Sequence, residues 1–310
     1  EALDLIRHSS KNHSRTDPDW AILKARVLYF QNDFQGALQN LNQFLNANQT
    51  DKYNVNLPND LLLLAYRCHF ELKQYADAIK YLTLLIATEP KTNYLKELAN
   101  LHGLQKEPIK QLAITEILYD QNKLSEENQL INYIYLLNSM RNPYKAALVI
   151  DQALASGLIT ANSKNLGLSA KLWLQAHEIE SAVLQLKLAA PLAGDGNYYF
   201  LLSNVFVRSK LWESAEEAIT KALNKGLTDS KKHHAILLRG QILYRLGKHR
   251  QAKKAFLTAA SNQITTQSAT SWLSLYDSEG TYFRKIDQET IIANPMFLEN
   301  TRPKAFFKKP

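Results

Sequence analysis

Three kinds of side chain in this 310-residue sequence have the chemistry that an enzyme or a metal site requires. His233 and His234 are adjacent imidazoles, Cys68 offers a thiol, and Glu126 and Glu127 are paired carboxylates. Neighbouring residues point in different directions on a helix, so these pairs cannot converge on one metal ion or one reacting atom. The sequence also lacks Gly-x-Ser-x-Gly, a Gly-rich phosphate loop and His-Glu-x-x-His. We therefore expect no catalytic residue, no metal site and no cofactor.

Composition excludes several other classes of protein. The balance of 45% apolar and 21% charged residues is typical of a packed globular chain. Only 10 glycines argue against an all-β fold, and the single cysteine cannot form an internal disulfide. The net charge of +8 is too small and too dispersed to predict nucleic-acid binding. No apolar run approaches the length of a transmembrane helix.

One spacing recurs along the chain and predicts the elements that position the side chains. A bulky residue is followed after two positions by alanine, then by apolar residues four and seven positions beyond the alanine. Five clear copies begin at Phe34, Tyr75, Ile179, Trp212 and His249. A looser copy begins at Tyr144, and in the weakest, within 108–118, Gln111 replaces the alanine. The key positions are 37, 78, 111, 147, 182, 215 and 252, which scatter about the roughly 34-residue period of the tetratricopeptide repeat.

This pattern predicts pairs of helices. Positions three and four apart share a helix face, and the alanine allows a close approach to a partner helix that carries a small residue twelve positions earlier. A single pair cannot bury its own apolar face, so successive pairs must stack. We predict an all-α fold: a right-handed superhelical solenoid of about seven tetratricopeptide hairpins over residues 1–278, the third degenerate. A helix over Ser268–Ser278 caps it, and residues 279–310 form an irregular basic and aromatic tail.

In such an architecture the first helix of each pair lines a concave groove. Its side chains here alternate basic or amide groups with aromatic ones, a mixture suited to binding a polypeptide. The alternative is that the apolar members only seal contacts between pairs. The predicted groove residues are Arg26, Tyr29, Arg67, Phe70, Lys171, Phe200, Asn204, Arg208, Gln241, Tyr244 and Arg245.

Further motifs over residues 90–280 resemble one bacterial family of tetratricopeptide proteins, which is encoded with TonB energy-transduction systems. The motifs are Asn142–Ala147, Ala155–Ile159, Asn165-Leu166, Ala189-Ala190, Asp195-Gly196, Tyr198, Trp212-Glu213, Ala215, Ala222-Leu223, Gly226-Leu227 and Ser271–Leu273. The resemblance implies a periplasmic protein that contacts members of a TonB-dependent transport complex. It assigns no catalytic residue, and the tail after Gly280 has no counterpart in it.

The sequence thus favours a non-enzymatic scaffold that binds other proteins or peptides, among them components of a TonB complex, in the bacterial envelope. Two alternatives remain open at this point. The same groove would serve an adaptor for outer-membrane or exopolysaccharide assembly, or would present substrate within a larger enzyme. A cytoplasmic location is the alternative to the periplasm. A missing signal peptide decides nothing, since Glu1 is not an initiator residue.

Overall fold

The computed structural model describes residues 18–47 and 57–278, and these residues are almost entirely helical, with no strand among them. This confirms the predicted all-α fold. The predicted tail, 279–310, lies outside the described residues. The chain divides into two compact units at Val149 and Ile150, inside one helix of the continuous solenoid that the sequence predicted. Within the described ranges, no helix is long and apolar enough to cross a bilayer.

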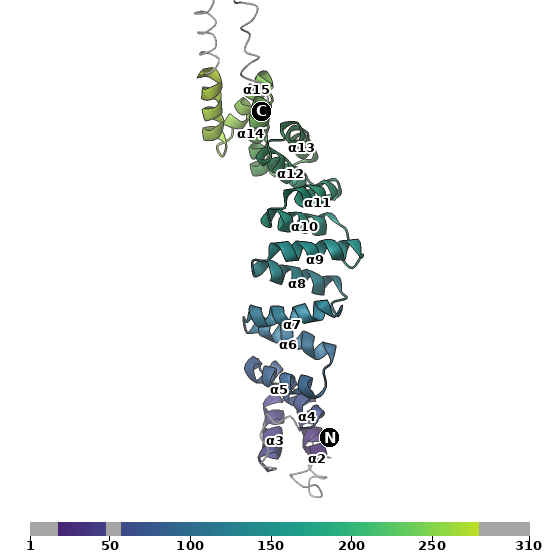
Figure 1. Cartoon of the computed structure of the whole chain (residues 1–310). Helices are drawn as coiled ribbons and strands as arrows, with labels where there is room; N and C mark the ends of the chain where they lie inside the picture. Colours follow the sequence, from purple (N-terminus) through teal and green to yellow (C-terminus); the bar gives the residue numbers. More distant parts are fainter. Residues whose placement is uncertain (1–17, 48–56, 279–310) are drawn as a thin grey trace, which may run out of the picture. The chain divides into compact units, whose positions relative to one another are not determined.

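In the first unit, α2 packs on α3, α4 on α5 and α6 on α7, as three successive pairs of helices (Figure 1). Weaker contacts join α3 to α4, α5 to α6 and α7 to α8, so each pair also packs on the next. The helices are α2 (Pro18–Phe30), α3 (Phe34–Ala47), α4 (Asn59–Glu71), α5 (Tyr75–Thr88), α6 (Thr92–Leu104), α7 (Pro108–Asp120) and α8 (Glu127–Ser139), followed by α9 (Pro143–Ala155), which contains the boundary.

The second unit repeats this arrangement, with α10 on α11, α12 on α13 and α14 on α15. The last helix of the described residues spans 266–278, close to the bounds of the predicted capping helix. The named helices are α10 (Ser163–Gln175), α11 (Ile179–Leu192), α12 (Asn197–Arg208), α13 (Trp212–Lys225), α14 (Asp229–Arg245) and α15 (His249–Ala260).

The alanines that revealed the repeat are the places of closest packing. All six have no exposed surface: Ala37, Ala78, Ala147, Ala182, Ala215 and Ala252. The small partner residues Ala25, Ala170 and Ser203 are equally buried, as expected where two helices cross closely. A Cβ added to Gly240 would lie 2.5 Å from the ring of Phe256, so only glycine fits beneath that ring. The alanine position of the sequence repeat therefore marks the point at which the two helices of each pair cross.

In the degenerate third pair, the close crossing of the two helices depends on a glycine of the first helix and not on an alanine of the second. Gln111 occupies the alanine position on α7, and Gly103 lies opposite it on α6. A Cβ added to Gly103 would be 2.9 Å from Nε2 of Gln111, so the missing side chain of the glycine makes room for the amide. The substitution thus brings a polar side chain to a position that is normally apolar.

Every turn within a pair has one residue in the left-handed conformation at the same position. Its φ lies between +58° and +73° in all seven turns, at Asn32, Lys73, Lys106, Arg141, His177, Lys210 and Gly247. The following amide then bonds back to the first helix, as Gln74 N does to His69 O at 2.8 Å. This is the Schellman ending of a helix, which satisfies carbonyls that would otherwise lack a partner.

Candidate functional site

A surface pocket of about 510 Å³ lies in the second unit. Its walls come from α10, α12 and α14, the first helices of three successive pairs, and from the connection between α11 and α12. The residues that line it are Ser163, Lys171, Ala193, Gly194, Asp195, Asn197, Tyr198, Phe200, Leu201, Asn204 and Lys231. Lys171, Phe200 and Asn204, three of the predicted groove residues, therefore meet at one place. We call it the lysine pocket.

A close backbone contact fixes the connection that forms one wall of the lysine pocket. The amide of Gly196 donates to the carbonyl of Gly226 at 2.8 Å. A Cβ on Gly196 would lie 2.1 Å from the carbonyl oxygen of Ala222, so no other residue fits there without a shift of backbone. This contact holds the start of α12 against the end of α13 and thereby positions Asp195.

Tyr198 packs α12 onto α10 beside the lysine pocket. Its ring lies over Gly167, where an added Cβ would come within 2.2 Å of the phenol. Burial, and then the nearby carboxylate of Asp195, raise the pKa of the Tyr198 hydroxyl above its ordinary value. The phenol therefore stays protonated in neutral solution and remains able to donate a hydrogen bond.

Positive charges outnumber negative ones in the lining of the lysine pocket. Lys171 and Lys231 bring two exposed ammonium groups to it from α10 and α14. Nζ of Lys231 donates to Oδ1 of Asn197 at 2.7 Å, which holds this lysine at the pocket. The only carboxylate of the lining, Asp195, accepts from the amide of Asn197 at 2.9 Å and so stabilises the start of α12. The excess positive charge favours an acidic ligand.

Asn204 and Phe200 supply the uncharged part of the lining. Nδ2 of Asn204 donates to the carbonyl of Phe200 at 2.7 Å, one turn earlier on α12. This bond fixes the carboxamide with one N–H committed to the helix. Phe200 is half-buried against the core of the unit, so its ring is held rigidly and presents only part of its surface. A pocket with a fixed ring, an amide and two cations can accommodate an aliphatic stem that ends in a carboxylate.

The predicted groove residues of the first unit lie on α2 and α4. Arg26 forms an exposed ion pair with Asp60, at 2.7 Å between Nη2 and Oδ2, which connects the two helices. Arg67 is exposed, Tyr29 is half-buried, and Phe70 is 39% exposed. Because Arg26 already has a carboxylate partner, a ligand would have to compete with Asp60 for it.

Tyr244 has a structural role instead. It is only 9% exposed, and its ring packs edge-on against Trp272 of the last helix at 5.5 Å. The sequence placed this residue on the groove because its position repeats that of Tyr29 and Phe70. The structure places it in the contact between α14 and the helix over residues 266–278, which covers that face.

The other predicted residues of the second unit are dispersed. Arg208 is exposed at the end of α12, and Gln241 is half-buried on α14. The guanidinium of Arg245 lies over the ring of Trp212 at 5.9 Å, a cation–π contact that engages one face of the group. None of the three lines the lysine pocket.

Among the polar residues of the lysine pocket, sequence reasoning missed Lys231 and Asn197, which bring a second cation and a second carboxamide to the lining. α14 begins at Asp229, about a turn before the start that the repeat spacing gives, and this extension brings Lys231 to the pocket. The signal was Thr228-Asp229, since a hydroxyl residue followed by an acid is typical of a helix start. Asn197 could have been found from Asp195-Gly196-Asn197, which marks the start of α12 in the same way.

The reactive side chains considered at the outset have ordinary surroundings. Burial raises the pKa of the Cys68 thiol to about 12, with a smaller contribution from Glu71, so the thiolate is absent at neutral pH. His233 and His234 each direct Nδ1 at a backbone carbonyl one turn earlier, at 2.7 and 2.8 Å. Among the described residues, no group of three potential ligands could hold a metal ion.

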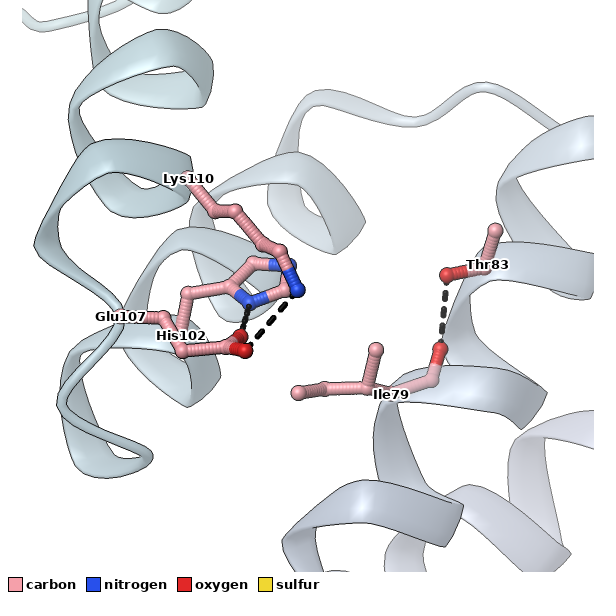
Figure 2. A network of polar contacts seen from close by, with 5 residues as sticks. All are labelled: Ile79, Thr83, His102, Glu107 and Lys110. Carbon is pink, nitrogen blue, oxygen red and sulfur yellow. Dashed lines mark hydrogen bonds and ion pairs between the residues drawn. The ribbon is translucent and has the colours of Figure 1, made fainter.

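Another histidine, His102, closes a turn between two helices. Nδ1 of His102 lies 2.7 Å from Oε2 of Glu107, and Lys110 donates to the same carboxylate at 2.9 Å (Figure 2). The bonds from Lys110 and then His102 lower the pKa of Glu107. His69 and Gln74 make the equivalent contact in the preceding pair at 2.7 Å, 33 residues earlier. The recurrence at the repeat period identifies this contact as a means of joining helices.

Comparison with known proteins gives the same fold. Residues 61–92 match the family model described as "Tetratricopeptide repeat". No curated protein matches the chain. A chain in the structure of Naa15/Naa10 bound to HypK-THB aligns with a TM-score of 0.59 at 15% identity, over 86% of this chain and 40% of that one.

Two bacterial structures align over most of their length. One is the C-terminal part of a TPR repeat-containing protein from Cytophaga hutchinsonii, with 14% identity, a TM-score of 0.48 and coverage of 81% of this chain and 98% of that one. The other is a tetratricopeptide repeat protein from Parabacteroides merdae, with 16% identity, a TM-score of 0.40 and coverage of 84% and 98%. At such identities the likeness concerns the fold alone. The described part of this chain is an all-α solenoid of the tetratricopeptide type.

Proposed function

We propose that this protein is a non-enzymatic scaffold that binds an acidic segment of a partner polypeptide in the lysine pocket. One observation carries the proposal: Lys171, Phe200 and Asn204, from two first helices, meet Lys231 from a third around a single cavity of about 510 Å³. Tetratricopeptide repeats typically bind proteins, and this cavity has the size and mixed lining of a binding site. In this proposal the repeat supplies the helices, and the pocket is the place where side chains from three of them contact the same ligand.

The charge of the pocket defines the chemistry of the partner. Two ammonium groups face the ligand, and the one carboxylate of the lining is engaged at the start of α12. A glutamate or aspartate side chain, or a chain end, matches this arrangement through charge-assisted hydrogen bonds. Phe200 and Leu201 provide the apolar contact that an aliphatic neighbour in the same segment requires.

We further propose that the partner belongs to a TonB-dependent transport complex and that the protein acts in the periplasm. This proposal rests on the motifs over residues 90–280 that resemble tetratricopeptide proteins encoded with TonB systems. Fractionation of cells that express the complete gene tests the location, which must be periplasmic. Recovery with cytoplasmic markers would contradict the location and leave the binding role intact.

The test of the binding site is reversal of its charge. The variant Lys171→Glu/Lys231→Glu should bind purified periplasmic segments of TonB-complex proteins at least roughly tenfold more weakly than the unaltered chain, because two charge-assisted bonds become repulsive. Calorimetric titration at two salt concentrations measures the effect. A higher salt concentration should weaken binding by the unaltered chain more than binding by the variant.

The matched control is Lys187→Glu/Lys254→Glu, which makes the same change of charge in the second unit at exposed lysines outside the lysine pocket. It should retain the affinity of the unaltered chain. An equal loss of affinity in both double variants would show that the ligand recognises the overall charge of the protein and not the pocket. Failure of every TonB-complex segment to bind, with acidic peptides still bound, would reject the TonB assignment alone.

A further inference from the structure

A second pocket of about 510 Å³ lies in the first unit, and its lining differs in kind. It is formed by α6, α7 and α8, which belong to the degenerate third pair and the pair after it. Its residues are Lys96, Ala99, Asn100, Gln111, Thr115, Leu118, Leu124, Gln129, Asn132, Tyr133, Tyr135, Leu136 and Ser139. We call it the amide pocket.

Four carboxamides dominate the amide pocket: those of Asn100, Gln111, Gln129 and Asn132. No carboxylate lines it, and its one cation, Lys96, donates to Oε1 of Gln129 at 3.2 Å. A ligand therefore meets neutral groups that can both donate and accept. A cationic ligand finds no carboxylate here, and the single ammonium, that of Lys96, is already engaged by Gln129, so the lining favours an uncharged ligand.

Gln111, the residue at which the third copy departs from the repeat, lines the amide pocket. Gln111 replaces the alanine of the third copy, and Gly103 makes the space in which its side chain lies. An ordinary copy would have placed a methyl group here and left the wall apolar. The departure from the repeat thus adds a hydrogen-bonding group to the lining, with Thr115 one turn later on α7.

The lining also holds an unsatisfied hydroxyl. Tyr133 is 1% exposed, and its hydroxyl has no hydrogen-bond partner within the described residues. Burial raises the pKa of this hydroxyl strongly, helped by Glu116 and Asp120, so it is a neutral phenol. A buried polar group without a partner costs free energy, and a bound ligand or water that accepts a hydrogen bond from this hydroxyl would remove that cost.

We propose that the amide pocket binds an uncharged, extended segment of a partner polypeptide through its peptide groups. Each residue of an extended chain offers an N–H and a C=O, which a carboxamide can pair with by accepting one bond and donating another. Ala99, Leu118 and Leu136 supply the apolar surface for a small side chain of that segment. This site is separate from the lysine pocket and takes a ligand of different charge.

Two pools of blocked octapeptides test the proposal on the full chain. One pool contains only Gly, Ala, Ser, Asn, Gln and Leu, and the other has Glu at every second position. The strongest binder of the neutral pool is titrated by calorimetry against Asn100→Leu and Asn132→Leu. Each variant should bind it roughly five- to tenfold more weakly, because leucine keeps the branched shape of asparagine and lacks its hydrogen-bonding groups.

The control is Asn42→Leu, an exposed asparagine of α3 outside the amide pocket, which should leave the affinity unchanged. Far-ultraviolet dichroism of each variant checks that the helices persist. The double variant Lys171→Glu/Lys231→Glu should bind the neutral peptide normally and lose only the acidic pool, which separates this proposal from the function of the lysine pocket.

Several results would overturn the proposal. They are the absence of any binder in the neutral pool, equal affinity in Asn42→Leu and Asn100→Leu, and stronger binding of acidic peptides that depends on Asn100. Competition by maltotriose that Asn132→Leu abolishes would assign the pocket to a saccharide instead, since hydroxyl groups also pair with carboxamides.

Discussion

At the scale of single residues, Asp151 shows how a polar substitution within the repeat is accommodated. It stands on α9 where clear copies have an apolar residue, and its carboxylate accepts three bonds. These come from Oγ of Ser169 at 2.5 Å, Nε1 of Trp173 at 2.8 Å and Nε2 of Gln185 at 3.1 Å. The donors lie on α10 and α11, so the side chain of Asp151 connects the part of α9 that belongs to the second unit with these two helices.

Replacing Asp151 with the residue that the repeat favours should therefore destabilise the protein. Asp151→Leu removes the acceptor of a hydroxyl, an indole and an amide, at a cost of about 2–4 kcal/mol in the free energy of unfolding. Urea denaturation followed by tryptophan fluorescence measures it. The triple variant Asp151→Leu/Ser169→Ala/Gln185→Leu should recover part of the loss, because two donors disappear with the acceptor. A single variant as stable as the unaltered protein would show that the three bonds contribute nothing.

At the scale of elements, each pair of helices depends on a turn whose left-handed residue is usually not glycine. Among the seven left-handed residues in the turns within pairs, six have a side chain and only Gly247 has none. A Cβ in this conformation crowds the following carbonyl and costs about 1 kcal/mol. The chain accepts this cost repeatedly because the Schellman bonds at the helix end offset part of it.

Glycine at such a turn should stabilise the protein. Lys210 has φ of +58° and an exposed side chain, and Lys210→Gly should raise the free energy of unfolding by about 0.5–1 kcal/mol. Lys210→Ala, which keeps the Cβ, should give no such gain. Gly247→Ala should lower stability by about 1 kcal/mol, since an added Cβ meets no atom within 4 Å and only the backbone strain remains. Thermal unfolding compares the three; a loss of stability in Lys210→Gly would contradict the reasoning.

At the scale of the whole molecule, each pair contacts mainly its sequence neighbours, so the effect of a change should stay local. The last helix covers the exposed end of the second unit. Trp272 stacks on Phe256 with 5.5 Å between ring centres and an interplanar angle of 11°. Phe256 has no exposed surface, and Ala269 of the same last helix is also fully buried.

Trp272→Ala should expose Phe256 and Tyr244 and cost about 2 kcal/mol, less than a fully buried tryptophan because Trp272 is half-buried. Hydrogen exchange should accelerate in α14 and α15 and remain unchanged in α4 and α5 of the first unit. The control, Leu257→Ala, removes a side chain that is 55% exposed and should leave both regions unaltered. Faster exchange along the entire chain would show instead that the repeats unfold as one cooperative block.

The sequence alone determined the helices, the period of the pairs and the residues at their crossing points. These depend on contacts between positions three, four and about twelve apart, all of which a single chain specifies locally. It also predicted that the first helices carry the groove side chains, and three of these, Lys171, Phe200 and Asn204, line the lysine pocket.

Only the tertiary structure decided which of those residues meet. Tyr29 and Tyr244 hold equivalent positions, yet Tyr244 is buried because a capping helix follows it. Lys231 reaches the lysine pocket because α14 begins a turn early, and the side chain of Gln111 fits beside α6 because Gly103 has no Cβ. Such outcomes depend on how each helix packs against its particular neighbours, and the repeat spacing, being the same for every copy, does not contain that information.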